Sequence, residues 1–99
     1  MSLLNNSSKG TLEQIIDTCI AAISTWMPDY RKGEVKKIWM YDKAEDFVLG
    51  LAIGMIYAYF EGAFLTVYHR QIDPQERAEV MTVISLRMPQ IREALFRAG

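Results

Sequence analysis

The fold of this chain is decided by residues 47–68, which read FVLGLAIGMIYAYFEGAFLTVY. Glu61 is the only charged side chain in this otherwise apolar run. Asp42 and Glu45 precede the run at the spacing of a capping box, and two basic residues follow it, where they would face the negative end of a helix dipole. We therefore predict one long helix over residues 43–70.

Two amphipathic segments flank this helix. Before it, apolar side chains recur at helical spacing and predict a helix from Thr11 to near Trp26. We expect Pro28 to end this helix, because a proline disfavours helical geometry in the residue before it. After it, Asp73 stands directly before a proline, with Glu76 at the third helical position, and this pattern is typical of a helix start. The apolar face that follows predicts a last helix, which Pro89 kinks or breaks by removing a backbone donor.

These segments predict an all-α fold. We expect a three-helix bundle, or a 3+1 bundle if the last helix breaks, with the long helix at its centre. The 99 residues suffice for one core. We divide them into a flexible N-terminus, residues 1–10, and a single helical domain, residues 11–99. Apolar residues make up 51% of the chain, more than so small a domain readily buries, which favours dimerisation through helix faces.

Several classes of function are not favoured. The net charge of −1 gives no basic field that would attract nucleic acid. The chain has no Gly-rich phosphate loop and no nucleophile turn, and its single histidine, His69, lacks a glutamate at metal-pair spacing. We therefore expect no catalytic residue, cofactor or metal and lean towards a non-enzymatic role. Cys19, the only cysteine, reads as a small buried hydrophobe and suits a reducing compartment, so we expect a cytoplasmic location.

Small residues recur every four positions along the long helix, at Gly50, Gly54, Ala58 and Gly62. At 100° per residue they form one slowly drifting ridge. Each glycine costs about 1 kcal/mol of helix stability relative to alanine. Close approach of another helix, or a kink, would explain that cost. The neighbour could be the first helix, the last helix or the same helix of a second copy, and we predict a packing or dimer interface here.

Glu61 falls on nearly the same side of the helix as Tyr57 and Tyr68. Four interpretations are open: a core carboxylate paired with a tyrosine or with an arginine such as Arg87, a residue on a solvent strip, an acid or base in a pocket, or a metal ligand. We favour the paired core carboxylate, because a buried charge without a partner is costly. The pocket candidate consists of Tyr57, Glu61 and Tyr68.

A basic patch precedes the long helix and comprises Arg31, Lys32, Lys36 and Lys37. Aromatic residues interleave it, which suits nucleic acid, a membrane surface, or a structural role in which the rings pack inward and the lysines stay in water. Asp29 and Glu34 dilute its charge, so we expect the structural role. Val35, Ile38 and Trp39 are spaced like one short helical turn that docks on the bundle.

The long helix could also span a membrane, by its length and composition. The flanking helices have apolar faces that need something to pack on, and the long helix is the only candidate. We therefore expect a buried helix at the centre of the bundle. A membrane partner is not favoured, although insertion stays open.

The function we expect is a small non-enzymatic helical interaction module, with a regulatory or assembly role. It would act as a homo-oligomer, most simply a homodimer, or bind a partner protein. The alternative is a small-molecule-binding or enzymatic helical protein with a pocket around Glu61, Tyr57 and Tyr68. A third hypothesis is nucleic-acid binding through the basic patch at residues 31–37.

Overall fold

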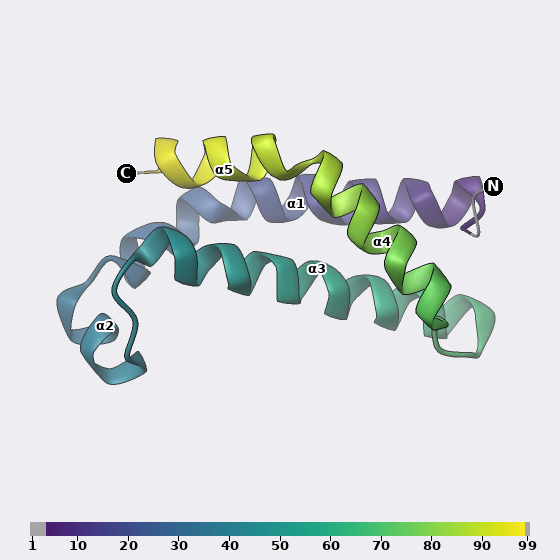
Figure 1. Ribbon diagram of the computed structural model, residues 1–99, viewed down its shortest axis with the longest axis horizontal. Coiled ribbons are helices and arrows are strands. Elements are labelled where there is room, and N and C mark those ends of the chain that lie inside the picture. The colour runs from purple at the N-terminus through teal and green to yellow at the C-terminus, as the bar shows by residue number, and fades with distance from the viewer. Residues whose placement is uncertain (1–3, 99) are drawn as a thin grey trace.

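The computed structural model describes residues 4–98 (Figure 1). Within that range the chain forms five helices and no strand, which confirms the all-helical class. The helices are α1 (Asn6–Tyr30), α2 (Gly33–Trp39), α3 (Ala44–Tyr68), α4 (Pro74–Leu86) and α5 (Met88–Arg97). Residues 1–3 of the predicted flexible N-terminus, and Gly99, lie outside the described residues.

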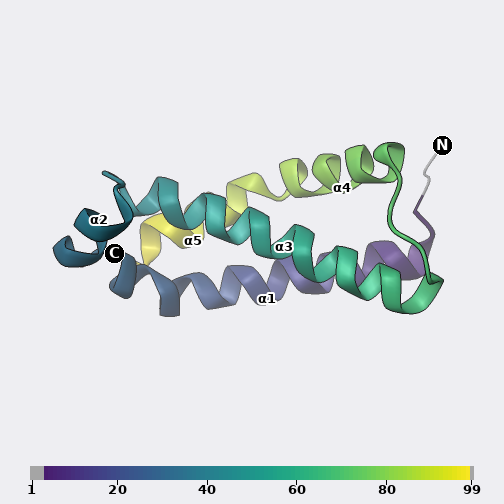
Figure 2. The same ribbon diagram turned by 90° about the horizontal axis from the view of Figure 1, so that it is seen from below.

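The helices form an elongated molecule of 44 × 24 × 19 Å. Figures 1 and 2 show α1 and α3 side by side and running in opposite directions, with α2 at the end where they connect. From the far end of α3 the chain returns through α4 and α5. α5 packs on both α1 and α3, so that α4 and α5 together act as a third, broken rod.

The first helix is longer than the sequence predicted at both ends. It begins at Asn6 because the side chain of Asn5 accepts a hydrogen bond from the backbone N–H of Ser8, at 2.8 Å, and so caps the helix. The predicted start at Thr11 is wrong. The helix also continues through Pro28 to Tyr30, because the proline removes a single backbone bond while the turn around it is held by core packing.

The predicted capping box of the long helix is also wrong. Lys43 is the N-cap of α3, and no side chain of the described residues caps this end. Glu45 instead forms an ion pair with Arg31, at 2.8 Å, which ties the start of α3 to the end of α1. The helix ends at His69, whose left-handed φ of 56° turns the chain towards α4.

The start of α4 confirms the sequence prediction. The backbone N–H of Glu76 donates to the Asp73 side chain at 2.7 Å, and the Glu76 carboxylate accepts from the backbone N–H of Asp73 at 2.9 Å. The last helix breaks rather than bends: α4 ends at Leu86, and α5 begins at Met88 with Pro89 in its first turn.

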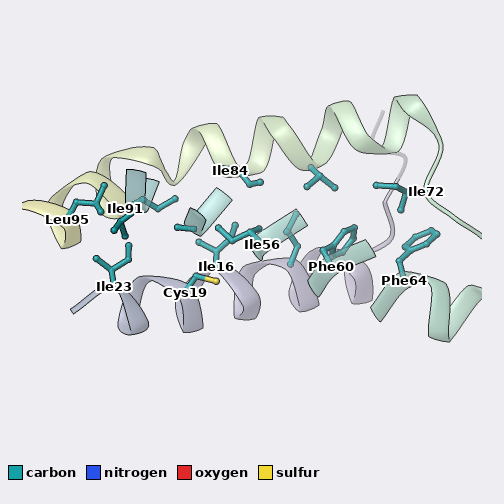
Figure 3. Packing of buried hydrophobic residues seen from close by; sticks show 14 of the residues in the cluster. Ile16, Cys19, Ile23, Ile56, Phe60, Phe64, Ile72, Ile84, Ile91 and Leu95 are labelled. Carbon is teal, nitrogen blue, oxygen red and sulfur yellow. The ribbon is translucent and has the colours of Figure 1, made fainter. Parts of the chain in front are cut away.

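The core is formed by one apolar stripe from each rod (Figure 3). On α3 the stripe takes every fourth residue: Ala44, Val48, Ala52, Ile56, Phe60 and Phe64. The stripe of α1 comprises Leu12, Ile16, Cys19, Ile23 and Met27. The third rod contributes Val80, Ile84, Ile91 and Leu95. Burial raises the pKa of the Cys19 thiol, which confirms its prediction as a small core residue.

One prediction about α3 is wrong: it is not the buried centre of the molecule. Within its most apolar stretch of 18 residues, only 28% of the residues are buried. The reason is geometric, since two rods on neighbouring sides cover only part of a helix that is apolar nearly all round. By length and composition alone, α3 is the one described helix that could cross a membrane.

The joint between α3 and α4 depends on a buried carboxylate. The carboxylate of Glu76 accepts two hydrogen bonds from the guanidinium of Arg70, at 2.8 and 3.0 Å, in addition to the capping bond. The same guanidinium lies 4.9 Å from the centre of the Phe64 ring. Hydrogen bonding by Arg70, followed by the backbone of Asp73, outweighs burial and holds the pKa of Glu76 below its ordinary value of 4.5.

We expect Glu76→Gln to lower the free energy of unfolding at pH 7 by about 1–2 kcal/mol, because the charge-assisted bonds to Arg70 are lost. A lowered pKa stabilises the folded state above 4.5, and this contribution is lost as the pH falls below that value. Urea unfolding at several pH values from 7 to 3 should therefore show that the free energy of unfolding falls less steeply with decreasing pH in the variant than in wild type. We call this fall the acid limb.

The control is Glu93→Gln, which removes an exposed carboxylate whose one ion-pair partner among residues 4–98 is Arg97. It should leave both the stability at pH 7 and the acid limb nearly unchanged. An acid limb that is equally steep in wild type and Glu76→Gln would contradict the role of the Glu76 charge.

Candidate functional site

The small-residue ridge of α3 faces away from the core. Each of its four residues, Gly50, Gly54, Ala58 and Gly62, follows two positions after a residue of the buried stripe. Two positions correspond to about 200° around a helix, so ridge and stripe lie on opposite sides. All four are exposed, and a Cβ built on any of the three glycines meets nothing within 4 Å in the described chain.

This position decides between the neighbours that the sequence left open. No described atom of α1, α4 or α5 comes within 4 Å of a Cβ built on the three glycines, so close approach by the chain's own first or last helix is wrong there. Arg77 of α4 only borders a hollow that it shares with Ala58 and Gly62. The remaining neighbour, α3 of a second copy, stays a prediction.

An apolar groove runs beside the ridge, between α1 and α3. It encloses about 690 Å³, and its lining includes Ile15 and Trp26 from α1 and Met55 and Tyr59 from α3. The side chain of Tyr59 is 58% exposed. Met55 and Tyr59 each directly follow a ridge residue, so groove and ridge adjoin. We call the ridge and this groove together the open face.

Glu61 lies on the side of α3 that faces α4. Its carboxylate accepts from the Nη2 and Nε atoms of Arg77, at 3.1 and 3.2 Å, and both side chains are partly exposed. The predicted pairing with an arginine is confirmed, but the partner is Arg77 and not Arg87 or a tyrosine, and the predicted location in the core is wrong. Arg87 instead bonds to Glu13 and Asp17 of α1, at the break between α4 and α5.

The predicted pocket residues are only partly brought together. Tyr57 lies near the Glu61–Arg77 pair, and its pKa is raised chiefly by burial of the hydroxyl. That hydroxyl has no hydrogen-bond partner among residues 4–98. The hydroxyl of Tyr68 bonds to Asn5 at 2.7 Å and to Ser8 at 3.1 Å, at the start of α1. Three turns of helix, about 16 Å, separate it from Tyr57.

Two of the four residues of the basic patch form ion pairs with acidic side chains, and the other two do not among residues 4–98. Arg31 is paired with Glu45, and Lys32 lies 3.5 Å from Asp29. Lys36 and Lys37 remain on α2, a helix that buries none of its residues in the described structure.

The predicted docking of α2 on the bundle is wrong for Ile38, which is 75% exposed. Only Trp39 makes ring contacts, edge-on to Tyr30 and Phe47 at centroid distances of 5.9 and 5.6 Å. The rings therefore hold α2 at the end of the bundle, where Val35 is half-buried while Ile38 and Trp39 remain exposed.

Sequence reasoning missed two parts of the surface. Arg77 as the partner of Glu61 depends on the register between α3 and α4, which no local pattern specifies. The groove beside the ridge could have been inferred, because Met55 and Tyr59 lie about 100° around the helix from Gly54 and Ala58, between the ridge and the buried stripe. Its depth depends on how α1 crosses α3.

Residues 4–98 contain no group of three histidine, cysteine or acidic side chains that could hold a metal ion. No family model, curated protein or solved structure matches this chain.

The two tyrosines provide a matched pair of substitutions. We expect Tyr57→Phe to leave stability unchanged or to raise it by about 1 kcal/mol, because it removes a buried hydroxyl without a partner. Tyr68→Phe should lower stability by about 1 kcal/mol, because it removes bonds to α1. Urea unfolding of both variants measures the difference, and a Tyr57→Phe variant as destabilised as Tyr68→Phe would refute it.

Proposed function

We propose that this chain is a non-enzymatic helical assembly module. In this proposal three rods, α1, α3 and the broken rod α4–α5, form a bundle, and α3 packs its ridge against the ridge of a second copy. The observation that carries the proposal is the exposed row of glycines on an apolar helix, with open space beyond each glycine.

The three glycines of the ridge lower the stability of the isolated chain, and no close contact among the described residues compensates for this cost. Three glycines within α3 cost about 3 kcal/mol relative to alanine. Alanine would fit at each position, since a Cβ there meets no described atom within 4 Å. A second helix that approaches the ridge closely would gain backbone contact that an alanine ridge would reduce. The groove beside the ridge supplies apolar surface for the same contact.

The charge on α3 favours an antiparallel pair of copies. A twofold axis between Gly54 and Ala58 would place Gly50 of one copy opposite Gly62 of the other. The two Glu61 side chains would then lie about 15 Å apart along the helices, whereas a parallel pair would bring them side by side. The antiparallel arrangement also opposes the two helix dipoles favourably.

We expect Gly54→Leu to convert a dimer to a monomer without unfolding the chain, because the added side chain meets only open space within one copy. Sedimentation equilibrium at micromolar to 100 µM protein measures the association, and far-UV circular dichroism confirms the helix content.

Gly10→Leu is the matched control. Gly10 is also a helical glycine with open space beyond its Cα, but it lies on α1, outside the open face. This variant should remain dimeric. A strictly monomeric wild type, or a Gly54→Leu variant that dimerises as wild type does, would refute the proposed function. If the chain associated only with a different protein, that protein, and not a second copy, would be the partner of the ridge.

Cysteine cross-linking should report the direction of the pair. In a Cys19→Ala background, we expect Gly50→Cys and Gly62→Cys variants to form disulfides rapidly when mixed and slowly when alone. In an antiparallel pair, identical positions are about 18 Å apart along the helices, beyond the reach of a disulfide. Rapid self-linking of each variant would indicate a parallel pair instead.

A further inference from the structure

The end of the molecule formed by α2 exposes three consecutive apolar residues. Ile38 is 75% exposed, Trp39 is 56% exposed and Met40 is 89% exposed. Consecutive exposed apolar residues are unusual on a protein surface and mark contact with a partner or a membrane. We call these three residues the α2 tip.

The backbone of the α2 tip is also unfavourable for an isolated chain. Met40 ends α2 in the left-handed conformation, with a φ of 61°, which a residue with a Cβ adopts at a cost. The helix has only seven residues and buries none of them in the described structure. So short a helix is marginal in water unless an apolar face is covered.

Lysines surround the tip. Residues 32–43 contain four lysines, at 32, 36, 37 and 43, against two acidic residues, Glu34 and Asp42. Of these lysines only Lys32 forms an ion pair within residues 4–98. The segment therefore carries a net charge of +2, from four lysines and two acidic residues, and Asp29 offsets part of it by pairing with Lys32.

The α2 tip lies where it could meet a flat surface. Figures 1 and 2 show α2 projecting at one end of the long axis, opposite the end where α3 turns into α4. The tip therefore lies at one end of the molecule, beside a shallow hollow whose lining includes Lys36, Lys37 and Met40.

We propose that the α2 tip attaches the molecule to an anionic lipid surface. Ile38 and Met40 enter the boundary of the acyl chains, Trp39 lies at the level of the headgroups, and the lysines face the lipid phosphates. This inference is independent of the assembly proposed for α3.

The chemistry of the tip favours lipid over single-stranded nucleic acid. Bases stack on aromatic faces, but the two most exposed side chains, Ile38 and Met40, have no aromatic ring. The one ring of the tip, Trp39, is in contact with Tyr30 and Phe47. Insertion into a lipid surface uses the aliphatic side chains directly.

The test is binding to vesicles of phosphatidylcholine alone or with about 30% phosphatidylserine. In a Trp26→Phe background, Trp39 is the only tryptophan. We expect its emission to shift to the blue with the anionic vesicles, and the protein to sediment with them. Ile38→Gln with Met40→Asn should weaken partitioning roughly tenfold or more. Glutamine preserves helix propensity and asparagine tolerates the left-handed conformation, so the loop is retained.

Lys36→Gln with Lys37→Gln should weaken binding roughly 30-fold, at about fivefold for each lysine near an anionic surface. The control is Met81→Gln with Leu86→Gln. These residues are 59% and 77% exposed on α4, which runs from the end opposite the tip to the middle of the molecule (Figure 1), and their loss should leave binding unchanged.

Three outcomes would overturn the inference. They are no binding to anionic vesicles, equal binding to neutral and anionic vesicles, and equal losses for the tip variant and the Met81/Leu86 control. A gel shift of a single-stranded oligonucleotide that the lysine variant abolishes, without vesicle binding, would assign the tip to nucleic acid instead.

Discussion

The antiparallel packing of α1 against α3 is the contact on which the rest of the structure depends. Both helices present apolar side chains at helical spacing, and residues such as Ile16, Ile23, Ile56 and Phe60 are removed from water almost completely. The third rod is too short and too polar to fold alone, and it completes the core only because this pair offers a shared surface. Removing apolar area from water at this seam drives the fold, while hydrogen bonds and ion pairs fix its ends.

Much of the fold could be predicted from local sequence. Helical periodicity gave the three apolar faces, and the chemistry of Asp73 and Pro89 gave the start of α4 and the break before α5. The errors arose at the helix ends. Asn5 caps α1 ahead of the predicted Thr11, so one local signal prevailed over another. At α3 the helix starts after Lys43 and the Glu45 side chain forms a tertiary ion pair with Arg31 instead of the predicted capping box. A cap contributes about 1 kcal/mol, which a tertiary contact of this kind can outweigh.

The candidate surfaces could be predicted less completely, and for a different reason. The ridge is visible in the spacing of Gly50, Gly54 and Gly62, but a helical wheel cannot tell which side of α3 the other rods cover. The partner of Glu61 depends on the register between two helices joined by a turn. The exposure of Ile38 and Met40 reflects how little of α2 reaches the bundle, which composition alone does not reveal.

The ion pairs between the rods also restrict how the apolar stripes can slide. Side chains that repeat every four residues leave the apolar stripes free, by spacing alone, to be offset by one helical turn, about 5.4 Å. Arg87 bonds to Glu13 and Asp17 at the middle of the molecule, and Arg31 bonds to Glu45 at one end. An offset arrangement would separate these charges, so the ion pairs favour the observed register.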